Sequence, residues 1–222
     1  MGTMARYIKH KTRNAGRASG GCVYAFKKHL IESFSTKFLF NNNDVCISII
    51  IKGKTCNLVP RYINCNNWSF DFNALDNFLT NLRSESFCVF GDLNARVGNA
   101  QIFDEQLFDG YPYVTHKRNS KDSVIDSKGR QVLELFENIG AVILNGRHVG
   151  DTEGNFTFQR GTARSVIDFA ACSFDILGLI SSFSVPVKEY SNHMPIIVNL
   201  CIPDKKKLAV GIVSIQSREY MR

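Results

Sequence analysis

Short apolar runs alternate with amphipathic stretches along the whole chain. Residues 45–51 and 56–62 are apolar and rich in β-branched side chains, and a Lys-Gly-Lys turn lies between them. Such runs bounded by turn residues are typical of β-strands, so the two are predicted to pair as a hairpin. Residues 87–91 form another apolar run, which predicts a short buried strand that ends at Asp92.

Two stretches have the periodicity of amphipathic helices. From Leu75 to Leu82, apolar residues recur at the i, i+3, i+4, i+7 spacing that places side chains on one helical face. Residues 132–139 repeat the pattern and precede Gly140, a common helix end. Further strands are predicted at the other apolar runs, residues 22–26, 141–144, 155–158, 166–171 and 195–200.

Strands and helices alternate without an internal repeat, which predicts a layered α/β sandwich in one domain. The chain has 222 residues, of which 44% are hydrophobic and 21% charged, and these values suit a globular domain with a sizeable core. No apolar run approaches the roughly 18 residues of a membrane span, so no membrane partner is expected.

We expect a basic disordered arm at residues 1–15, the domain at 16–202 and an exposed tail at 203–222. The polar stretch 99–127 is predicted to be a long functional loop.

The net charge of +7 is concentrated at one end of the chain. Residues 1–30 hold seven of the 27 Lys and Arg residues and no acid, and the other 20 equal the 20 acids in number. A basic arm suits nucleic acid or another polyanion, and it equally suits a solvated chain end. The seven cysteines are odd in number and lack CxxC spacing, which argues against a zinc site and a disulfide-linked partner. This usage favours a reducing intracellular compartment, nuclear or cytoplasmic.

The sharpest candidate for chemistry is the turn that follows residues 87–91. Asp92 and Asn94 stand at positions i and i+2, which point to the same side in an extended chain. A carboxylate and a carboxamide so placed can position a water, a phosphate oxygen or a hard cation. An Asx-rich turn that only caps the strand has the same sequence, so both interpretations stay open.

Two further polar residues stand in or beside apolar strands. Asp168 lies inside the run 166–171, where a buried acid must be paired, bound to metal or perturbed in its ionisation, because an unpaired buried charge is costly. The alternative is an acid on an edge strand that faces solvent. His193 comes just before the strand predicted at 195–200. It can contact a phosphate or donate a proton, or it can serve the structure alone.

In chain order the three motifs are GDLNA, VIDFA and SNHMP. Together they resemble the endonuclease/exonuclease/phosphatase superfamily, also called DNase I-like. The likeness is greatest to the apurinic-type endonuclease domain of LINE (non-LTR) retrotransposons and to craniofacial development protein 2-like sequences. It extends over about residues 16–200 and includes three more segments: GRASGG at residues 16–21, ILNG at 143–146 and GNFTF at 154–158.

The resemblance implies a role for each motif. In the family, the Asp and Asn of GDxN orient the attacking water and contact the scissile phosphate, and these roles fall on Asp92 and Asn94. Asp92 also belongs to the implied metal site. The family pairs the Asp of its second motif with the His of its third, which corresponds here to Asp168 and His193. A tyrosine between the third-strand region and the first helix touches the phosphate, and Tyr62 is the candidate.

Two features depart from the family pattern. The family chain begins with a strand carrying an Asn and a strand ending in the Glu that holds the metal, whereas here no acid precedes Glu32. The family's third motif is SDH, and its metal-site Asp is replaced here by Asn192. An amide keeps an oxygen ligand but removes one negative charge. We therefore expect a four-layer α/β sandwich that lacks the opening strands, with a weakened Mg²⁺ site.

The sequence predicts a Mg²⁺-dependent phosphodiesterase domain, ancestrally a DNA-nicking endonuclease of a retrotransposon, with weak or no activity. DNA is the expected partner. One alternative is a non-catalytic remnant or interaction module derived from a transposon. A second alternative is a phosphatase of the same superfamily acting on inositol or sphingolipid head groups, and the Gly-Gly, ILNG and GNFTF segments favour the retrotransposon branch over it.

Overall fold

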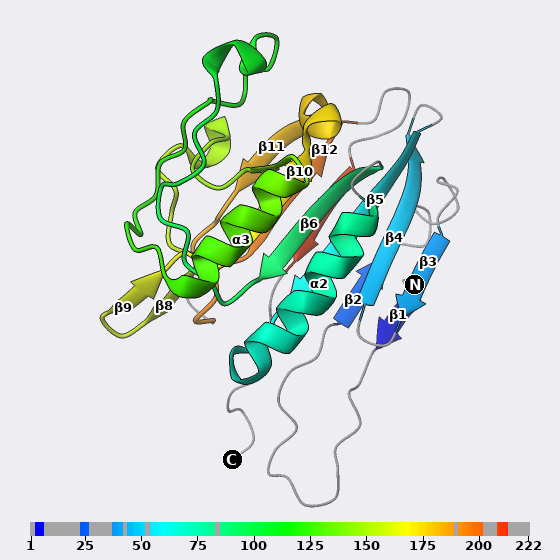
Figure 1. Cartoon of the computed structure of the whole chain (residues 1–222), viewed down its shortest axis with the longest axis horizontal. Coiled ribbons are helices and arrows are strands. Elements are labelled where there is room, and N and C mark those ends of the chain that lie inside the picture. The colour runs from blue at the N-terminus through cyan, green and yellow to red at the C-terminus, as the bar shows by residue number, and fades with distance from the viewer. Residues whose placement is uncertain are drawn as a thin grey trace, which may run out of the picture.

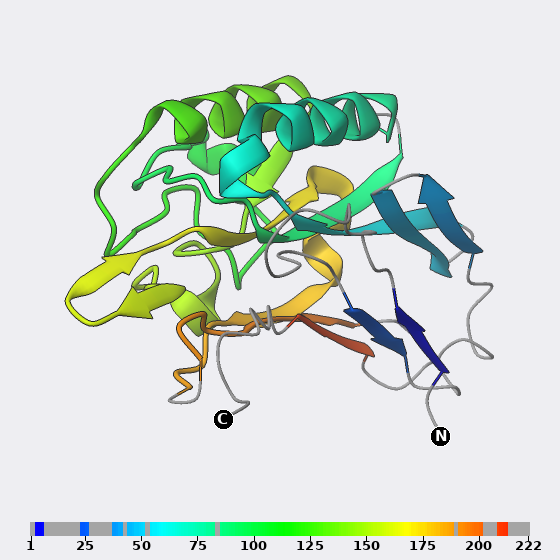
Figure 2. The ribbon, with the colours of Figure 1, turned by 90° about the horizontal axis from the view of Figure 1, so that it is seen from below.

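The computed structural model consists of stacked layers. It describes residues 3–6, 23–26, 37–41, 44–51, 54–82, 85–188, 191–201 and 208–212. Two α-helices, α2 (Trp68–Leu82) and α3 (Ser127–Asn138), lie on one face of a six-stranded sheet, and a smaller sheet lies on the other face (Figures 1 and 2). The described residues thus form an α/β sandwich of three layers rather than the predicted four, because none of their helices covers the outer face of the smaller sheet (Figure 2). None of their helices is long and apolar enough to cross a membrane.

The six-stranded sheet has the order β3-β4-β5-β6-β10-β7. Its strands are β3 (Lys37–Asn41), β4 (Asp44–Ile51), β5 (Lys54–Tyr62), β6 (Ser86–Asp92), β7 (Ala141–Ile143) and β10 (Asp168–Ser173). The predicted hairpin of β4 and β5 is confirmed. Strand β6 runs parallel to β5 and antiparallel to β10, so the later strand β10 lies between β6 and the sheet edge.

Both faces of this sheet are buried, which explains why its central strands read as continuous apolar runs. Phe87 and Val89 of β6 pack under the two helices, while Cys88 and Phe90 face the second sheet. The helices cover the sheet with the apolar side chains that the periodicity predicted, Leu75 and Leu79 of α2 and Val132 of α3 among them.

The start and end of α3 follow from local chemistry. The carboxylate of Asp126 caps the helix by accepting a hydrogen bond of 2.6 Å from the Gly129 amide. Gly140 follows the helix with φ of +66°, a conformation that glycine adopts at little cost. This confirms the predicted helix end.

The second sheet includes residues that the sequence assigned to an exposed tail. Strands β11 (Ile180–Ser184), β12 (Ile196–Leu200) and β13 (Leu208–Ile212) pair in that order. The prediction that residues 203–222 form only a tail was therefore wrong for β13, whose backbone pairs with all of β12. The other residues of that segment lie outside the described ones.

The basic arm also contains a strand. Thr3–Arg6 forms β1, which pairs with β2 (Val23–Phe26), although no hydrophobic period marks residues 3–6. The prediction of a disordered arm is corrected for these four residues because backbone pairing needs no apolar pattern. The rest of residues 1–15 lies outside the described part of the chain.

Two predicted strands begin later than expected. Residues 155–157 are irregular because Asn155 bonds back to Asp151, and the strand β8 (Phe158–Arg160) forms a hairpin with β9 (Ala163–Ser165). Residues 166 and 167 are likewise irregular and lead into β10. The hairpin projects from the body of the domain beyond α3 (Figure 1).

The predicted loop at residues 99–127 is held to the sandwich by two side chains. Arg147, which has no exposed surface, donates hydrogen bonds to the carbonyls of Gln101 and Thr115. The Gln101 side chain in turn closes the free edge of β7, because its amide donates to the Ala141 carbonyl at 2.7 Å and its carbonyl accepts from the Ile143 amide at 2.8 Å.

Candidate active site

Asp92 and Asp168 are directly opposite each other on adjacent strands. Asp92 ends β6, Asp168 begins β10, and the two are paired in the antiparallel register. Both side chains are buried. Two buried carboxylates at one end of a sheet repel each other unless a proton, a cation or a cationic side chain lies between them.

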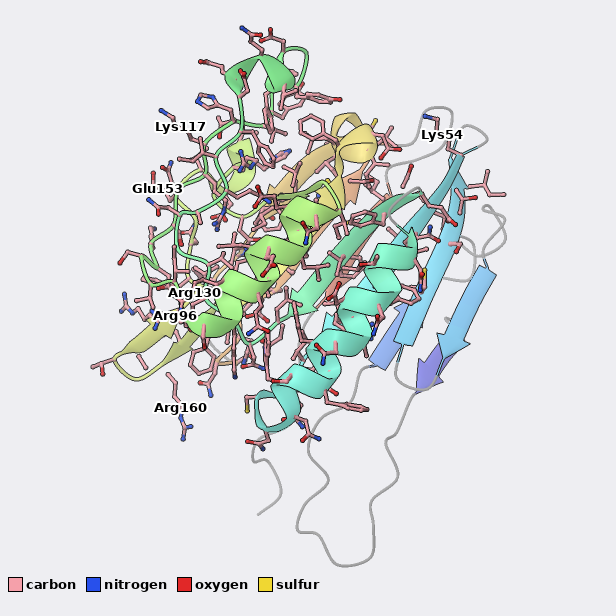
Figure 3. The ribbon with its side chains drawn as sticks, in the orientation of Figure 1. Lys54, Arg96, Lys117, Arg130, Glu153 and Arg160 are labelled. Carbon is pink, nitrogen blue, oxygen red and sulfur yellow. The ribbon has the colours of Figure 1, made fainter. Side chains whose placement is uncertain are left out.

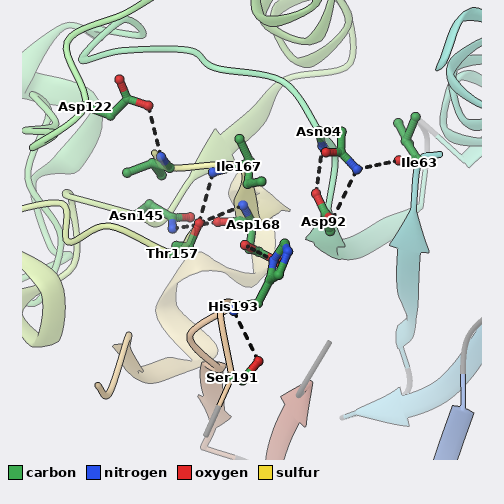
Figure 4. Close-up of polar contacts among 11 residues, drawn as sticks. Ile63, Asp92, Asn94, Asp122, Asn145, Thr157, Ile167, Asp168, Ser191 and His193 are labelled. Atoms are coloured by element: carbon green, nitrogen blue, oxygen red, sulfur yellow. Dashed lines mark hydrogen bonds and ion pairs between the residues drawn. The ribbon is translucent and has the colours of Figure 1, made fainter. Parts of the chain in front are cut away.

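His193 supplies such a group. Its Nδ1 lies 3.0 Å from Asp168 Oδ2 and 3.2 Å from Oδ1, and the ring is buried (Figure 4). The backbone amide of His193 donates to Ser191 Oγ at 3.1 Å, and the Phe158 ring packs edge-on against the imidazole with centroids 4.9 Å apart. The ring is therefore fixed by contacts on several sides.

Asn94 closes the turn after β6 in a left-handed backbone conformation, with φ of +46°. Asparagine tolerates this conformation better than most residues. Its backbone amide donates to Asp92 Oδ1 at 2.9 Å, and its Nδ2 donates to Asp92 Oδ2 at 3.2 Å and to the Ile63 carbonyl at 2.8 Å. Trp68, the one tryptophan of the chain, donates from Nε1 to the Leu93 carbonyl at 2.8 Å and so holds the same turn.

Burial and neighbouring charge set the protonation of this group. Burial and, after it, the charge of Asp168 raise the pKa of Asp92 to about 7, against lowering contributions from His193 and Asn94. Burial lowers the pKa of His193, but the hydrogen bond that it donates to Asp168 and the charges of Asp168 and Asp92 outweigh burial, so the pKa lies above the ordinary 6.5. The site thus holds a buried carboxyl whose pKa is about 7 beside an imidazole whose pKa is raised.

The site can offer several ligand atoms to a cation. Among the described residues, Asp92, Asp168 and His193 form one group whose potential ligand atoms all lie within 4.8 Å of one another. A cation there would relieve the repulsion that raises the pKa of Asp92, so the donor set fits a divalent ion. No Glu belongs to this group.

The two other predicted residues lie beside the group. Tyr62 ends β5 in register with Asp92, and its side chain is half-buried. Asn192 is exposed next to His193, and its carbonyl accepts the Gln159 amide at 2.8 Å. The roles assigned to them by the resemblance stay predictions.

Asn145, Thr157 and Asp122 were not predicted as site residues, although Asn145 and Thr157 belong to the ILNG and GNFTF segments. All three are buried, and each bonds to the backbone that leads into or through Asp168. Asp122 accepts from the Val166 amide at 3.0 Å and is paired with Arg96. The only sequence signal for this support was the resemblance of the two segments.

Gly91 is required where Asp92 is placed. Its φ is +137°, and a Cβ there would lie 1.9 Å from the Arg61 carbonyl oxygen of the neighbouring strand. We expect Gly91→Ala to lower the free energy of unfolding by roughly 3 kcal/mol or more, because backbone strain and displacement of β5 add together. Chemical denaturation measures this free energy.

Gly110→Ala is the matched control, since Gly110 also has positive φ but has no atom within 4 Å of the added Cβ. It should lower the free energy of unfolding by only about 1 kcal/mol. Equal losses in the two variants would contradict the steric argument.

Comparison with known proteins places this fold. No protein-family model and no curated protein matches the chain. The chain is similar to the endonuclease domain of TRAS1, a telomere-specific non-LTR retrotransposon, at 16% identity and a TM-score of 0.60, over 90% of this chain and 81% of that one. It also matches the 3'-5' exonuclease NExo of Neisseria meningitidis at 15% identity and TM-score 0.46, over 70% of this chain and 64% of that one. An AP endonuclease from Archaeoglobus fulgidus matches at 11% identity and TM-score 0.45, over 71% and 65%.

The class of fold follows from the first of these likenesses. The chain is an α/β sandwich of the DNase I-like type, as its motifs predicted. Over 90% of its length it resembles a retrotransposon endonuclease domain.

Proposed function

We propose that the domain is a divalent-cation-dependent phosphodiesterase that nicks DNA slowly. The observation that carries this proposal is the meeting of Asp92, Asp168 and His193 at one end of a DNase I-like sandwich. Hydrolysis of a phosphodiester needs an activated water, a group that donates a proton or positive charge to the phosphate, and neutralisation of developing charge. Buried carboxyl and imidazole groups within a few ångströms of one another suit the first two needs.

The contacts suggest a role for each side chain. Asp92 suits a residue that orients the attacking water, because its carboxylate is held in place by Asn94 and its oxygens can accept hydrogen bonds from a water. Asp168 holds Nδ1 of His193, which leaves Nε2 to face the phosphate and keeps the ring in one orientation. Asn94 and Tyr62 stand beside Asp92, where they are proposed to contact phosphate oxygens. Mg²⁺, held by Asp92 with help from Asn192, would neutralise charge on the phosphate when bound.

The rate is proposed to be low because the cation site is poor in charge. Asn192 offers a neutral amide where the resemblance places a carboxylate, and it is exposed. Loss of one carboxylate from a site for a hard cation weakens binding. Asn192→Asp is therefore expected to raise nicking modestly, since no Glu joins the described group.

Nicking of supercoiled plasmid tests the proposal. We expect slow, Mg²⁺-dependent formation of open circles at high protein concentration, lost in Asp92→Ala and in His193→Ala. Asp109→Ala is the matched control, because Asp109 is an exposed carboxylate on a loop away from the site. Nicking that Asp92→Ala leaves unchanged would show that another group, or a contaminant, is responsible.

A non-catalytic DNA-binding module is the second candidate. The neutral Asn192 favours it. It predicts DNA binding with no nicking in the wild-type chain or in Asn192→Asp, whereas the phosphodiesterase proposal predicts nicking in both.

The β8–β9 hairpin is proposed to contact the DNA beside the site. Arg160 and Arg164 are exposed on it, and its first residue, Phe158, forms a backbone bridge with His193. Arg160 lies at the hairpin end of the molecule, on the same side as Arg96 and Arg130, whereas Lys54 lies at the opposite end (Figure 3). The hairpin arginines are thus tethered next to the residues proposed to act on the phosphate.

Replacing both hairpin arginines by alanine should weaken duplex binding and reduce its salt dependence. Each phosphate contact contributes about 0.9 to the slope of log K against log salt, so the slope is expected to fall by roughly two. Fluorescence anisotropy of a labelled duplex over a salt series measures both quantities. Lys54→Ala is the control and should change neither. An unchanged slope in the double variant would remove the hairpin from the proposed DNA surface.

A further inference from the structure

At its site end, β10 has a strand of the described residues on one side only. Strand β6 pairs with β10 from Asp168 onward, but β7 pairs with it only from Ala171. The backbone groups of Asp168 that face the β7 side therefore need other partners, because unpaired buried amides and carbonyls are costly. Two side chains without exposed surface, Thr157 and Asn145, take the place of a strand there.

Both polar groups of the Asp168 backbone are held by these side chains. Thr157 Oγ1 accepts hydrogen bonds from the Ile167 and Asp168 amides, both at 2.9 Å. Asn145 Nδ2 donates to the Asp168 carbonyl at 3.1 Å (Figure 4). Asn145 Oδ1 accepts from the Ala170 amide at 3.0 Å. Hydrogen bonds from two side chains, rather than from a neighbouring strand, therefore hold the backbone that carries the Asp168 carboxylate.

Thr157 also holds the segment that carries His193. Its carbonyl accepts the Met194 amide at 2.7 Å, and the next residue, Phe158, forms the backbone bridge with His193. One residue therefore bonds to the backbone on both sides of the Asp168–His193 pair.

We propose that Thr157 is a positioning residue that sets the Nδ1–carboxylate contact between His193 and Asp168. The hydroxyl is the essential part, because its lone pairs satisfy two adjacent amides that a methyl group cannot. A shift of about 1 Å in the backbone of Asp168 or of His193 would break the contact of 3.0 Å between His193 Nδ1 and Asp168 Oδ2. The consequence for catalysis rests on the proposed function, whereas the positioning itself can be measured without activity.

The test compares Thr157→Val, which keeps the shape and removes the hydroxyl, with Thr157→Ser, which keeps the hydroxyl. The readout is the NMR signal of the proton on His193 Nδ1 in protein labelled with ¹⁵N-histidine, assigned by its loss in His193→Ala. We expect the signal to shift or broaden in Thr157→Val and to persist in Thr157→Ser. If Thr157→Val does not fold, Thr157→Ala takes its place, because the smaller side chain leaves room for water to reach the two amides.

Ser173→Ala is the matched control at the other end of β10. Ser173 Oγ likewise accepts a backbone amide, that of Phe87, at 3.0 Å, so its loss should destabilise the same strand without changing the His193 signal. An unchanged signal in the hydroxyl-free Thr157 variant would overturn the proposal, as would an equal change in Ser173→Ala.

Nicking kinetics separate this proposal from the proposed function. With nicking present, Thr157→Val should lower kcat by about 100-fold at similar KM, and Thr157→Ser should restore most of it. The expected NMR change together with no nicking in any variant, wild type included, would uphold the positioning role and defeat the proposed function.

Discussion

Replacing Asp92 by Asn is expected to abolish nicking and, at the same time, to stabilise the cation-free protein at pH 8. The pKa of the Asp92 carboxyl is about 7 in the folded chain, against an ordinary 3.8, because the group is buried beside Asp168. A raised carboxyl pKa means that ionisation favours the unfolded chain. The free energy of unfolding should therefore fall as pH rises from about 4 to 7, by roughly 4 kcal/mol.

An asparagine at this position carries no charge and avoids that loss. It gives up one acceptor for Asn94 Nδ2, which costs about 1 kcal/mol, so a net gain of about 3 kcal/mol is expected at pH 8 and a slight loss at pH 4. The raised pKa of His193 acts in the same direction in both proteins, since its stabilisation is complete below pH 6.5 and is lost as pH rises through the folded value. The free energy of unfolding of the variant should thus still depend on pH, but less than that of the wild type.

Urea unfolding in EDTA, followed by the fluorescence of Trp68, measures these stabilities across pH 4–8. Asp109→Asn is the control, because its carboxylate is exposed and its removal should leave the pH dependence as in the wild type. A variant that is less stable than the wild type at pH 8 would contradict the burial argument. Retained nicking by a stable Asp92→Asn protein would contradict the proposed role of the carboxylate.

Arg147→Met is expected to cause the largest loss of stability of any change considered, roughly 4 kcal/mol or more. Arg147 has no exposed surface, and its guanidinium lies over the rings of Phe103 and Phe108 at 5.1 and 5.4 Å. It donates to the carbonyl of Ile143 in β7 at 3.0 Å and to that of Thr115 in the loop at 2.6 Å. It also donates to the loop carbonyls of His116 and Gln101. Burial lowers its pKa to about 9, so it stays charged at neutral pH. Methionine fills similar space but leaves several buried carbonyls without donors.

The loss should be concentrated in the long loop between β6 and α3. Hydrogen exchange is expected to rise first in residues 101–116, while amides of β6 and β10 keep their protection until global unfolding. Arg130→Met is the matched control, because Arg130 is exposed on α3 and its loss should cost less than about 0.5 kcal/mol. Uniform loss of protection across the domain would show that Arg147 stabilises the whole sandwich rather than the loop.

Much of this architecture follows from local pattern. The β4–β5 hairpin, both helices and the buried strand β6 were marked by apolar period and turn residues. The convergence of Asp92, Asn94, Asp168 and His193 was expected from their places at strand ends and from the resemblance of their motifs. They lie together because β10 pairs beside β6 and the loop before β12 returns to the same end.

Other features had no local signal. Strand β9 and most of β8 are exposed on both faces, so no alternation of apolar and polar residues marks them. Strand β13 follows a run of lysines that reads as solvated chain. Arg147 reads as an ordinary basic residue of a loop, and Thr157 as an ordinary strand residue, because sequence period does not report hydrogen bonds from side chains to distant backbone groups.

The strand order has a consequence for how the chain is made. Strand β10 lies between β6 and β7, yet it follows both in the sequence, so a growing chain that has reached β7 still has two unpaired sheet edges facing each other. Synthesis from the N-terminus exposes these edges until residue 173 has left the ribosome. The strand that closes the gap is also the one that delivers Asp168. Nascent chains therefore bring Asp168 opposite Asp92 and protect their central edges in the same step, and shorter chains have done neither.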